Sequence, residues 1–249
     1  MKRSTDKYDG VPYLRYDPIG PPKGAILYLH GIGEKGNDIS DTTHSVIENN
    51  ELPKMCITPG FECPYIVIAP QLASNQGGWY QNTTTPMIQF VQGLSLDIHL
   101  TGLSLGAVPL LTIVKDNPSV FKTVGVICGK VDFTDQTSLN ALYAELAKVP
   151  CVCYYDPTDK TIYDGYDSIV RLYKTLNGKT DISLVTLKGV GSPHAIWSVA
   201  YPQYLTWLAA KIASQPVPDV VVSFNLIDGT LVAVTQSGKK VSITPASIQ

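Results

Sequence analysis

The sequence predicts an α/β fold in which a mostly parallel sheet is covered by helices on both faces. Two observations lead to this fold class. Short apolar runs of β-like composition alternate with longer helical runs along most of the chain, and this alternation is typical of parallel βαβ units. The chain also has 249 residues and 44% hydrophobic content, which is enough to bury a substantial core in one domain.

Each element is predicted from its local pattern. The strands are short runs rich in apolar and β-branched residues, at 25–29, 65–69, 96–101, 123–128, 150–155 and 182–187. The helices are longer runs, at 40–49, 105–116, 137–148, 162–177 and 201–213. An earlier strand, 13–16, is expected to add an antiparallel edge.

The last part of the chain departs from this alternation. Prolines at 216 and 218 interrupt both helix and strand, so residues 1–214 are predicted as one domain and 215–249 as an appendage. Asp228-Gly229 between β-rich runs predicts a hairpin and, with the run from Lys240, a three-stranded β-meander. A sheet of this size buries little apolar surface by itself, and it should therefore pack on the body or on a partner subunit. It is interpreted as an edge-covering appendage or as an element for homo-oligomerisation or substrate binding.

One motif indicates a chemistry. Gly102-x-Ser104-x-Gly106 lies between an apolar β-like run and an apolar helical run, which is the strand-turn-helix setting of a nucleophile elbow. The flanking glycines let strand and helix approach closely around a strained serine. A turn of small residues without catalytic function is the alternative.

A serine nucleophile requires a histidine base and a carboxylate that orients it. In this type of hydrolase the chain order is Ser, acid, His, and of the four histidines only His194 follows Ser104; the others are His30, His44 and His99. His194 lies in a glycine-rich loop after a predicted strand.

The acid is expected between these two residues, after the strand 150–155. Asp159 is preferred, because Asp156 precedes a proline and suits the capping of a turn. Asp132 and Asp135, after the preceding strand, are the alternatives.

An oxyanion hole needs two backbone N–H groups. Leu105 directly follows the nucleophile at the predicted helix start, and it supplies the first. The loop from His30, with Gly31 and Gly33, follows the strand 25–29 and offers Ile32 as the second donor. Without the other motifs this loop would be only a glycine-rich connection.

Five segments together resemble one family. They are Tyr28-Leu-His-Gly-Ile-Gly-Glu-Lys-Gly36, Tyr65-Ile-Val-Ile-Ala-Pro-Gln71, Leu100-Thr-Gly-Leu-Ser-Leu-Gly106, Val126-Ile-Cys-Gly129 and His194-Ala-Ile-Trp197-Ser-Val-Ala-Tyr201. The chain is similar, over about 24–208, to α/β-hydrolase esterases of the phospholipase/carboxylesterase group, which includes predicted peptidases and feruloyl and polyhydroxybutyrate esterases. The resemblance implies the α/β-hydrolase fold, the triad Ser104, Asp159 and His194, oxyanion donors at Ile32 and Leu105, and Trp197 beside the base.

The substrate pocket is expected to include His30, Gly31, Trp79 and Trp197. Aromatic walls suit an acyl group, an aryl group or a sugar face, and the sequence does not choose among acetyl, feruloyl, hydroxyalkanoate and simple alkyl esters.

Composition excludes some partners. A net charge of −2 and a pI near 6.1 give no reason to expect nucleic acid or an anionic membrane. Five cysteines without metal-ligand spacing predict neither a metal nor another cofactor, and free thiols are expected, with Cys56–Cys63 pairing as the alternative. The first residues lack the apolar stretch of a signal peptide, so a cytoplasmic location is expected; a leader already removed is the alternative.

The predicted function is therefore that of a serine hydrolase, which cleaves carboxylic esters of small molecules through an acyl-enzyme. Two alternatives remain open. A peptidase or an acyltransferase would use the same triad, and a catalytically silent relative would use the fold for binding.

Overall fold

The computed structural model of the protein describes residues 1–39, 45–214, 221–227, 230–235 and 240–242. It divides into two compact units, Met1–Leu208 and Ala209–Gln249. The division falls within the last helix of the first unit, ahead of the predicted boundary at Ser214.

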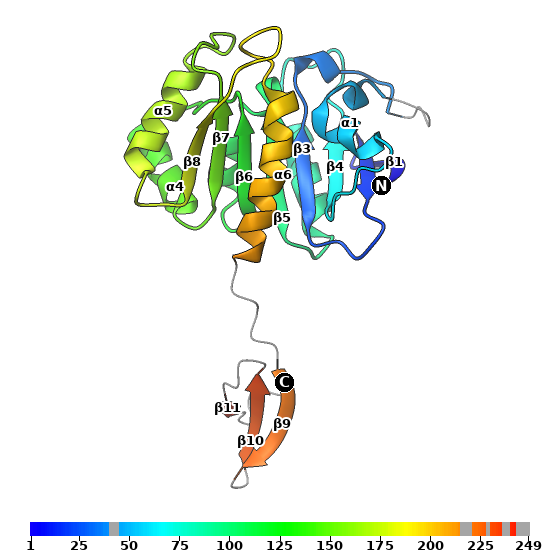
Figure 1. Ribbon diagram of the computed structural model, residues 1–249, viewed down its shortest axis with the longest axis vertical. Coiled ribbons are helices and arrows are strands. Elements are labelled where there is room, and N and C mark those ends of the chain that lie inside the picture. Colours follow the sequence, from blue (N-terminus) through cyan, green and yellow to red (C-terminus); the bar gives the residue numbers. More distant parts are fainter. Residues whose placement is uncertain (40–44, 215–220, 228–229, 236–239, 243–249) are drawn as a thin grey trace. The chain divides into compact units, whose positions relative to one another are not determined.

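The first unit is built on an eight-stranded sheet in the order β1-β2-β4-β3-β5-β6-β7-β8 (Figure 1). The strands are β1 (Lys2–Tyr8), β2 (Val11–Asp17), β3 (Ala25–Leu29), β4 (Ile66–Pro70), β5 (Ile98–Leu103), β6 (Phe121–Ile127), β7 (Cys151–Tyr155) and β8 (Ile182–Thr186). The pairs from β4 to β8 are parallel, whereas β1 and β2 are antiparallel to their neighbours. The predicted mostly parallel α/β sheet is thereby confirmed.

Burial explains why the central strands are continuous apolar runs. Every residue of β3, β4, β5 and β7 is buried, as expected for strands covered on both faces. The outermost strand β1 is charged and largely exposed, which protects the sheet edge from pairing with another chain. The predicted strand 13–16 is part of β2 and is antiparallel, but β1 forms the edge outside it.

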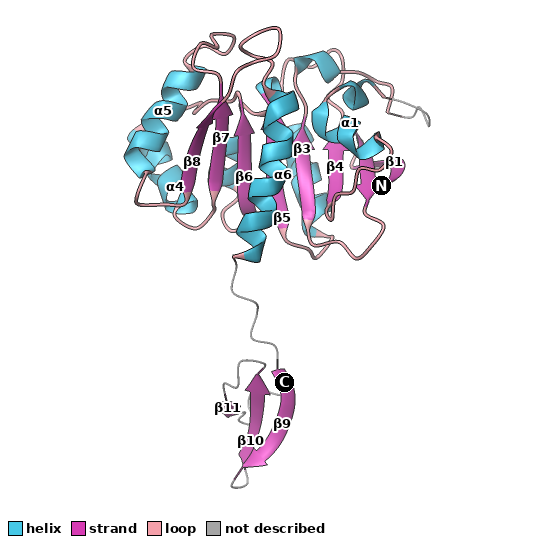
Figure 2. Cartoon of the chain, in the orientation of Figure 1, coloured by secondary structure: helices cyan, strands magenta, loops and turns pink. Residues whose placement is uncertain are grey.

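Helices lie on both sides of the sheet. They are α1 (Glu51–Ile57), α2 (Gln81–Gln92), α3 (Leu110–Asp116), α4 (Gln136–Leu146), α5 (Gly165–Leu176) and α6 (Trp197–Ala213). Figure 2 shows α6 passing in front of the strands, with other helical segments behind them. α2 contacts β1, β2 and β3, while α3 contacts β5 and β6.

One predicted helix differs from the structure at its start, and one helix of the structure was not predicted. Within the predicted helix 40–49, residues 45–49 are described and contain a 3₁₀ turn, η2 (Val46–Asn49), in which the Glu48 carboxylate accepts a hydrogen bond from the Ser45 N–H at 2.7 Å. The α-helix begins only at Glu51. α2 is not among the predicted helices, because its threonines and its internal Pro86 are poor helix formers.

The second unit contains three strands, β9 (Val221–Ile227), β10 (Thr230–Thr235) and β11 (Lys240–Ser242), paired antiparallel in the order β11-β10-β9. The predicted turns at 228–229 and 236–239 lie outside the described residues. Packing of this unit on the body or on a partner subunit stays a prediction.

Candidate active site

Ser104 lies on a sharp turn directly after the central strand β5. Its φ angle is +50°, in the left-handed region that is costly for a residue with a side chain. A Cβ built on Gly106 would lie 2.0 Å from the Leu29 carbonyl oxygen, and one on Gly102 would lie 2.7 Å from the same atom. Both positions therefore require glycine, because the turn packs directly against the end of β3.

The segment after the serine differs from the expected helix 105–116. Ser104–Gly106 is a single 3₁₀ turn, η3, and α3 begins at Leu110. The Ser104 carbonyl accepts hydrogen bonds from the N–H groups of Ala107 and Val108 at 2.9 and 3.2 Å. Pro109 precedes the helix and has no N–H to continue the bonding pattern. Leu105 therefore adjoins the nucleophile in a 3₁₀ turn and is not at the amino end of an α-helix.

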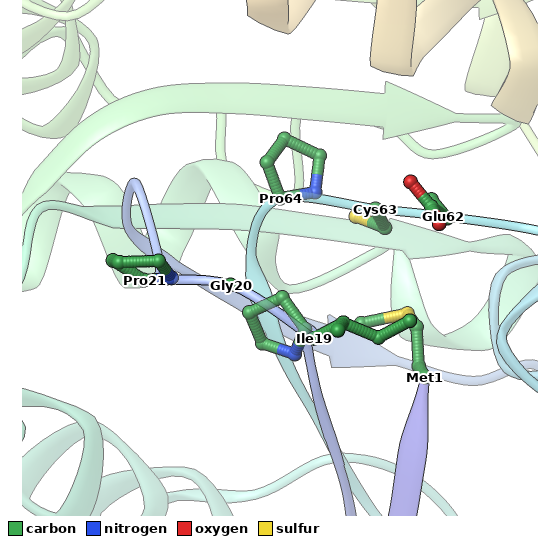
Figure 3. Close-up of a pocket in the computed structure, with 8 residues that line it drawn as sticks. Met1, Ile19, Gly20, Pro21, Glu62, Cys63 and Pro64 are labelled. Carbon is green, nitrogen blue, oxygen red and sulfur yellow. The ribbon is translucent and has the colours of Figure 1, made fainter.

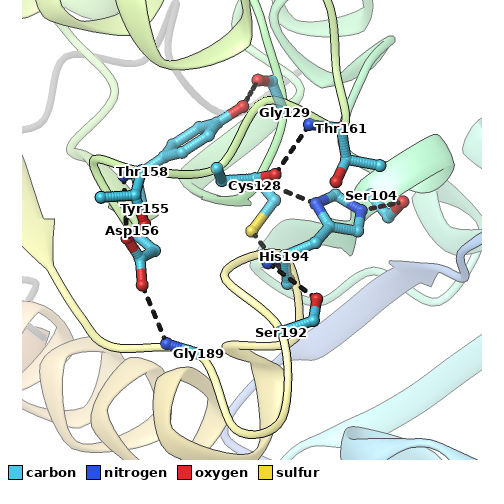
Figure 4. A network of polar contacts seen from close by, with 11 residues as sticks. Ser104, Cys128, Gly129, Tyr155, Asp156, Thr158, Thr161, Gly189, Ser192 and His194 are labelled. Atoms are coloured by element: carbon cyan, nitrogen blue, oxygen red, sulfur yellow. Dashed lines mark hydrogen bonds and ion pairs between the residues drawn. The ribbon is translucent and has the colours of Figure 1, made fainter.

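The structure brings Ser104, His194 and Asp159 into one hydrogen-bonded chain (Figure 4). The His194 Nε2 atom lies 2.7 Å from the Ser104 Oγ atom, and its Nδ1 atom lies 2.7 Å from Asp159 Oδ2. Since a carboxylate only accepts, Nδ1 carries the proton and donates to Asp159, which leaves Nε2 to accept from the serine hydroxyl. The loops that carry these residues follow β5, β7 and β8, whose parallel arrangement brings their carboxyl ends to one edge of the sheet.

The Asp159 side chain is almost completely buried, at 1% exposure, while that of His194 is 12% exposed. Burial by itself raises the pKa of the Asp159 carboxyl. Hydrogen bonds from His194 and from the Thr161 N–H, which lies 2.9 Å from Oδ1, more than offset this effect, so the pKa lies below its usual value. The carboxyl group is therefore held as the anion that orients the imidazole.

The other candidate acids lie elsewhere. Asp156 accepts hydrogen bonds from the Thr158 N–H at 2.8 Å and from the Gly189 N–H at 3.1 Å, so it caps the turn as predicted and also holds the loop that carries the histidine. The Thr158 hydrogen bonds lower the pKa of Asp156. Asp132 pairs with Lys130 at 2.5 Å, and Asp135 accepts from the Ser138 N–H at the start of α4.

The loop after β3 lies against the nucleophile. A Cβ built on Gly31 would lie 3.5 Å from the Ser104 Cβ and 2.7 Å from the Leu103 Cδ1 atom. Ile32 follows it and opens the 3₁₀ turn η1 (Ile32–Glu34), with a side chain that is 63% exposed. Gly31 thus lies next to Ser104, and the predicted second oxyanion donor, Ile32, follows it directly.

Solved structures with the same arrangement of elements were found by comparison. A thermostable esterase matches with a TM-score of 0.63 and 20% identity, over 84% of this chain and 62% of the esterase. A ferulic acid esterase matches with a TM-score of 0.59 and 14% identity, over 84% of this chain and 98% of the esterase. A puromycin-hydrolyzing peptidase from Mycobacterium tuberculosis matches with a TM-score of 0.54 and 14% identity, over 85% of this chain and 39% of the peptidase. The chain has the α/β-hydrolase fold. No family model and no curated protein sequence matches it.

Two of the expected pocket residues, His30 and Trp79, are buried. His30 is completely buried, and its ring donates from Nδ1 to the Gly31 carbonyl at 2.6 Å and accepts at Nε2 from the Leu72 N–H at 2.9 Å. Burial lowers its pKa to about 4, so the ring is neutral. Trp79 packs edge-on against His30 and donates to its carbonyl oxygen at 3.0 Å. Both side chains thus support the loop from inside the protein, and Trp79 also lines a cavity of about 290 Å³ together with residues of α2 and α3.

Trp197 is close to the base, as expected. Its ring packs edge-on against the His194 ring at a centroid distance of 5.7 Å. His99, by contrast, is buried in β5, with its Nδ1 atom 3.0 Å from the Thr123 hydroxyl, and burial lowers its pKa to about 4. His44 lies outside the described residues.

Cys128 lies next to the candidate triad. The sequence did not reveal this position, because Cys128 lies in a strand-like run. It lies just beyond β6 with φ +53°, and its thiol donates to the His194 carbonyl at 3.4 Å (Figure 4). Burial raises the pKa of the Cys128 thiol, and the nearby Asp159 carboxylate raises it further. The thiol thus stays protonated and helps to hold the loop that carries His194.

Within the described residues, the possible ligand atoms of Cys128, Asp159 and His194 lie within 4.8 Å of one another. A transition-metal site would need a thiolate and a free imidazole nitrogen. The raised pKa of Cys128 and the hydrogen bonds at both His194 nitrogens make this group a poor metal site. All five cysteines have free thiols, including Cys56 and Cys63.

A cavity of about 300 Å³ lies between the chain start and the segment before β4 (Figure 3). Met1, Ile19, Pro21, Glu62 and Cys63 are among its lining residues, and it includes none of the predicted site residues. Among the described helices, none has the combination of length and hydrophobicity that crossing a bilayer requires.

Proposed function

We propose that this α/β-hydrolase is a serine hydrolase that cleaves carboxylic esters through a covalent acyl-enzyme. The observation that carries the proposal is the continuous hydrogen-bonded chain from the Ser104 hydroxyl through His194 to Asp159, with both distances at 2.7 Å. A serine in a strained turn of this kind presents its Oγ atom at the edge of the sheet, where a substrate carbonyl can reach it.

In the proposed reaction, the Ser104 Oγ atom attacks the ester carbonyl carbon while His194 Nε2 takes the hydroxyl proton. The negative charge that develops on the carbonyl oxygen is stabilised by the backbone N–H groups of Leu105 and Ile32. The imidazolium then donates its proton to the leaving alcohol as the carbon–oxygen bond breaks. Water attacks the acyl-enzyme with His194 again as the base, and this step releases the acid and restores Ser104.

Asp159 has an electrostatic role in this scheme. Its buried carboxylate accepts from His194 Nδ1, which selects the tautomer that can receive the serine proton and stabilises the imidazolium after the transfer. The lowered pKa of Asp159 supports this role, because the group is ionised throughout the neutral range.

Apolar side chains near this edge of the sheet favour an ester with an apolar acyl or aryl group. Ile32, Tyr80 and Val190 follow β3, β4 and β8 and are 63%, 60% and 63% exposed. Large exposed apolar groups in loops at the carboxyl ends of neighbouring strands are suited to contact a substrate. The proposal therefore specifies small or medium-sized apolar esters.

The test is labelling with a fluorophosphonate probe combined with hydrolysis of p-nitrophenyl acetate. Wild-type protein should be labelled and active, and Ser104→Ala should be neither. Ser198→Ala, at an exposed position of α6, is the matched control and should behave like wild type. A folded wild-type protein that is not labelled would favour a binding protein that uses the fold without catalysis.

A peptidase with the same triad is the second candidate, favoured by the similarity to the puromycin-hydrolyzing peptidase. An ester and an amide with the same acyl group separate the two functions. Equal or higher kcat/KM for the amide would support a peptidase. Faster transfer to an added alcohol than to water would instead support an acyltransferase.

A further inference from the structure

Glu34 is a buried carboxyl group that the proposed reaction does not use. It ends η1, the 3₁₀ turn that begins at the proposed oxyanion donor Ile32, and it is only 5% exposed. Its Oε1 atom accepts a short hydrogen bond from the Asn50 side-chain amide, while Oε2 has no hydrogen-bond partner among the described residues. Removing a carboxyl group from water is costly, so its presence at this position calls for a physical reason.

The carboxyl group lies against Gly31 of the oxyanion loop. A Cβ built on Gly31 would be 3.0 Å from the Glu34 Oε2 atom and 3.5 Å from the Ser104 Cβ atom. The carboxyl group and the nucleophile therefore both lie close to Gly31, on the side where a side chain would project. Glu34 can determine where the Gly31 backbone lies, although the structure gives it no contact with the serine.

Beyond the contacts of His30 and Trp79 at its start, the loop has little of its own to stiffen it. η1 is only three residues long, and no side chain caps its first turn at Gly31. Asn50, in contrast, precedes α1, so the hydrogen bond between its amide and Glu34 ties the loop to a helix. A constellation of donors for a transition state must be held within about 0.5 Å of its productive geometry, which a glycine-rich loop cannot achieve without such support.

The surroundings of Glu34 are apolar or neutral. The Asn50 amide donates to the carboxyl group, and the backbone N–H groups of Gly31 and Glu34 lie close enough to act on its pKa. Glu34 in turn raises the pKa of the buried hydroxyls of Tyr28 from β3 and Tyr201 from α6, and Glu51 of α1 also acts on Tyr28. Burial has the largest effect on Glu34 and raises its pKa, although the Asn50 amide and the two backbone N–H groups oppose this effect.

We propose that Glu34 is a positioning residue of the oxyanion hole: its buried carboxyl group, held by Asn50, fixes the Gly31–Ile32 backbone against Ser104. This inference rests on the proposed function, because it assumes that the loop stabilises a tetrahedral intermediate. Glu34 acts through the backbone and does not touch the substrate. Its loss should therefore weaken transition-state stabilisation more than substrate binding.

The experiment compares Glu34→Ala, Glu34→Gln and Asn50→Ala with wild type, and uses Glu62→Ala as a control at an exposed glutamate. It measures kcat and KM for p-nitrophenyl acetate per fluorophosphonate-titrated site, and the inhibition constant of a trifluoromethyl ketone that forms a tetrahedral adduct. Glu34→Ala should lower kcat by about 10- to 100-fold with KM within about threefold, and should weaken the ketone by a similar factor. Glu34→Gln should recover most of the loss, because a neutral amide keeps the shape and the hydrogen bonds.

Unchanged kcat and ketone affinity in Glu34→Ala, with only a lower melting temperature, would overturn the inference. Equal losses in Glu34→Gln and Glu34→Ala would also overturn it. If Glu34→Ala does not fold, Asn50→Ala decides, since it should show the same kinetic pattern at smaller size and would contradict the inference if it matched wild type. Failure of the proposed function looks different, because wild-type protein itself would then be neither labelled nor active.

Discussion

Replacing Asp159 by asparagine tests the proposed triad most directly, because the change alters one functional atom at nearly constant volume. Asp159 Oδ2 lies 2.7 Å from His194 Nδ1, and Oδ1 lies 2.9 Å from the Thr161 N–H. In Asp159→Asn, the remaining carbonyl oxygen can accept from the Thr161 N–H, and the new NH₂ group then donates towards His194 Nδ1. The imidazole would place its proton on Nε2, where it can no longer accept from the Ser104 hydroxyl.

The expected loss in kcat is about three to four orders of magnitude at neutral pH. At about 1.36 kcal/mol per factor of ten, this corresponds to about 4–5 kcal/mol of lost transition-state stabilisation. The assay is p-nitrophenyl acetate hydrolysis, normalised to folded protein by thermal unfolding. KM should change little, because Asp159 is buried behind the imidazole and has no access to the substrate.

Asp156→Asn is the matched control for Asp159→Asn. Asp156 is three positions away in the same turn, and it accepts its hydrogen bonds from Thr158 and from the Gly189 N–H rather than from the imidazole. Asp156→Asn should lower the melting temperature and leave activity within about tenfold of wild type, because it weakens only the hydrogen bond that holds the histidine loop. The assignment of the acid would be refuted if Asp159→Asn kept activity within tenfold of wild type while Asp156→Asn lost it.

Further outcomes follow from the same contacts. Gly106→Ala should abolish fluorophosphonate labelling or folding, because its Cβ would overlap the Leu29 carbonyl. Gly20→Ala is the control and should be neutral, because there is open space around Gly20. A labelled and active Gly106→Ala would contradict the packing of the elbow against β3. Cys128→Ala should lower kcat/KM by about three- to tenfold, which is the effect of losing one weak hydrogen bond, and Cys128→Ser should restore kcat/KM. Identical kinetics in the two variants would show that the thiol hydrogen bond does not contribute to activity. The folded-state pKa values of His30 and His99, near 4, lie below the unfolded value, so the stability that their neutral forms provide should be lost as pH falls from about 6.5 to about 4. Urea unfolding between pH 7 and pH 5 should then show a smaller pH slope in His99→Gln, and equal slopes would exclude this cause. Deleting residues 219–249 should change thermal stability or oligomeric state yet leave labelling of Ser104 intact, whereas a folded truncation that is not labelled would place the meander in the active site.

The elbow was predictable because its requirements are local. A serine between two glycines, entered by a β-like run, implies a tight turn from backbone sterics alone, and the φ angle of Ser104 agrees. The central strands were predictable for a similar reason, since strands covered on both faces must be continuously apolar. The edge strand β1 and the helix α2 were missed, because their polar residues and Pro86 carry no clear periodic pattern.

The pocket was less predictable from residue type. His30 and Trp79 have side chains that are common in binding sites, yet both point into the protein and hydrogen-bond to the loop backbone. Nothing in the sequence distinguishes a buried histidine in a glycine-rich loop from one that faces a substrate. Only the packing of Leu72 and Trp79 around His30 decides between them.

By itself the sequence determined the α/β class, the nucleophile candidate and the single histidine that follows it, because these depend on local sterics and chain order. The tertiary structure decided which carboxylate meets His194, what Cys128 and Asp156 hold, and that the carboxyl of Glu34 is buried against the oxyanion loop. These contacts join segments separated by up to 66 positions in the chain. Their distances depend on how the ends of parallel strands come together at one sheet edge, and no local pattern encodes that distance.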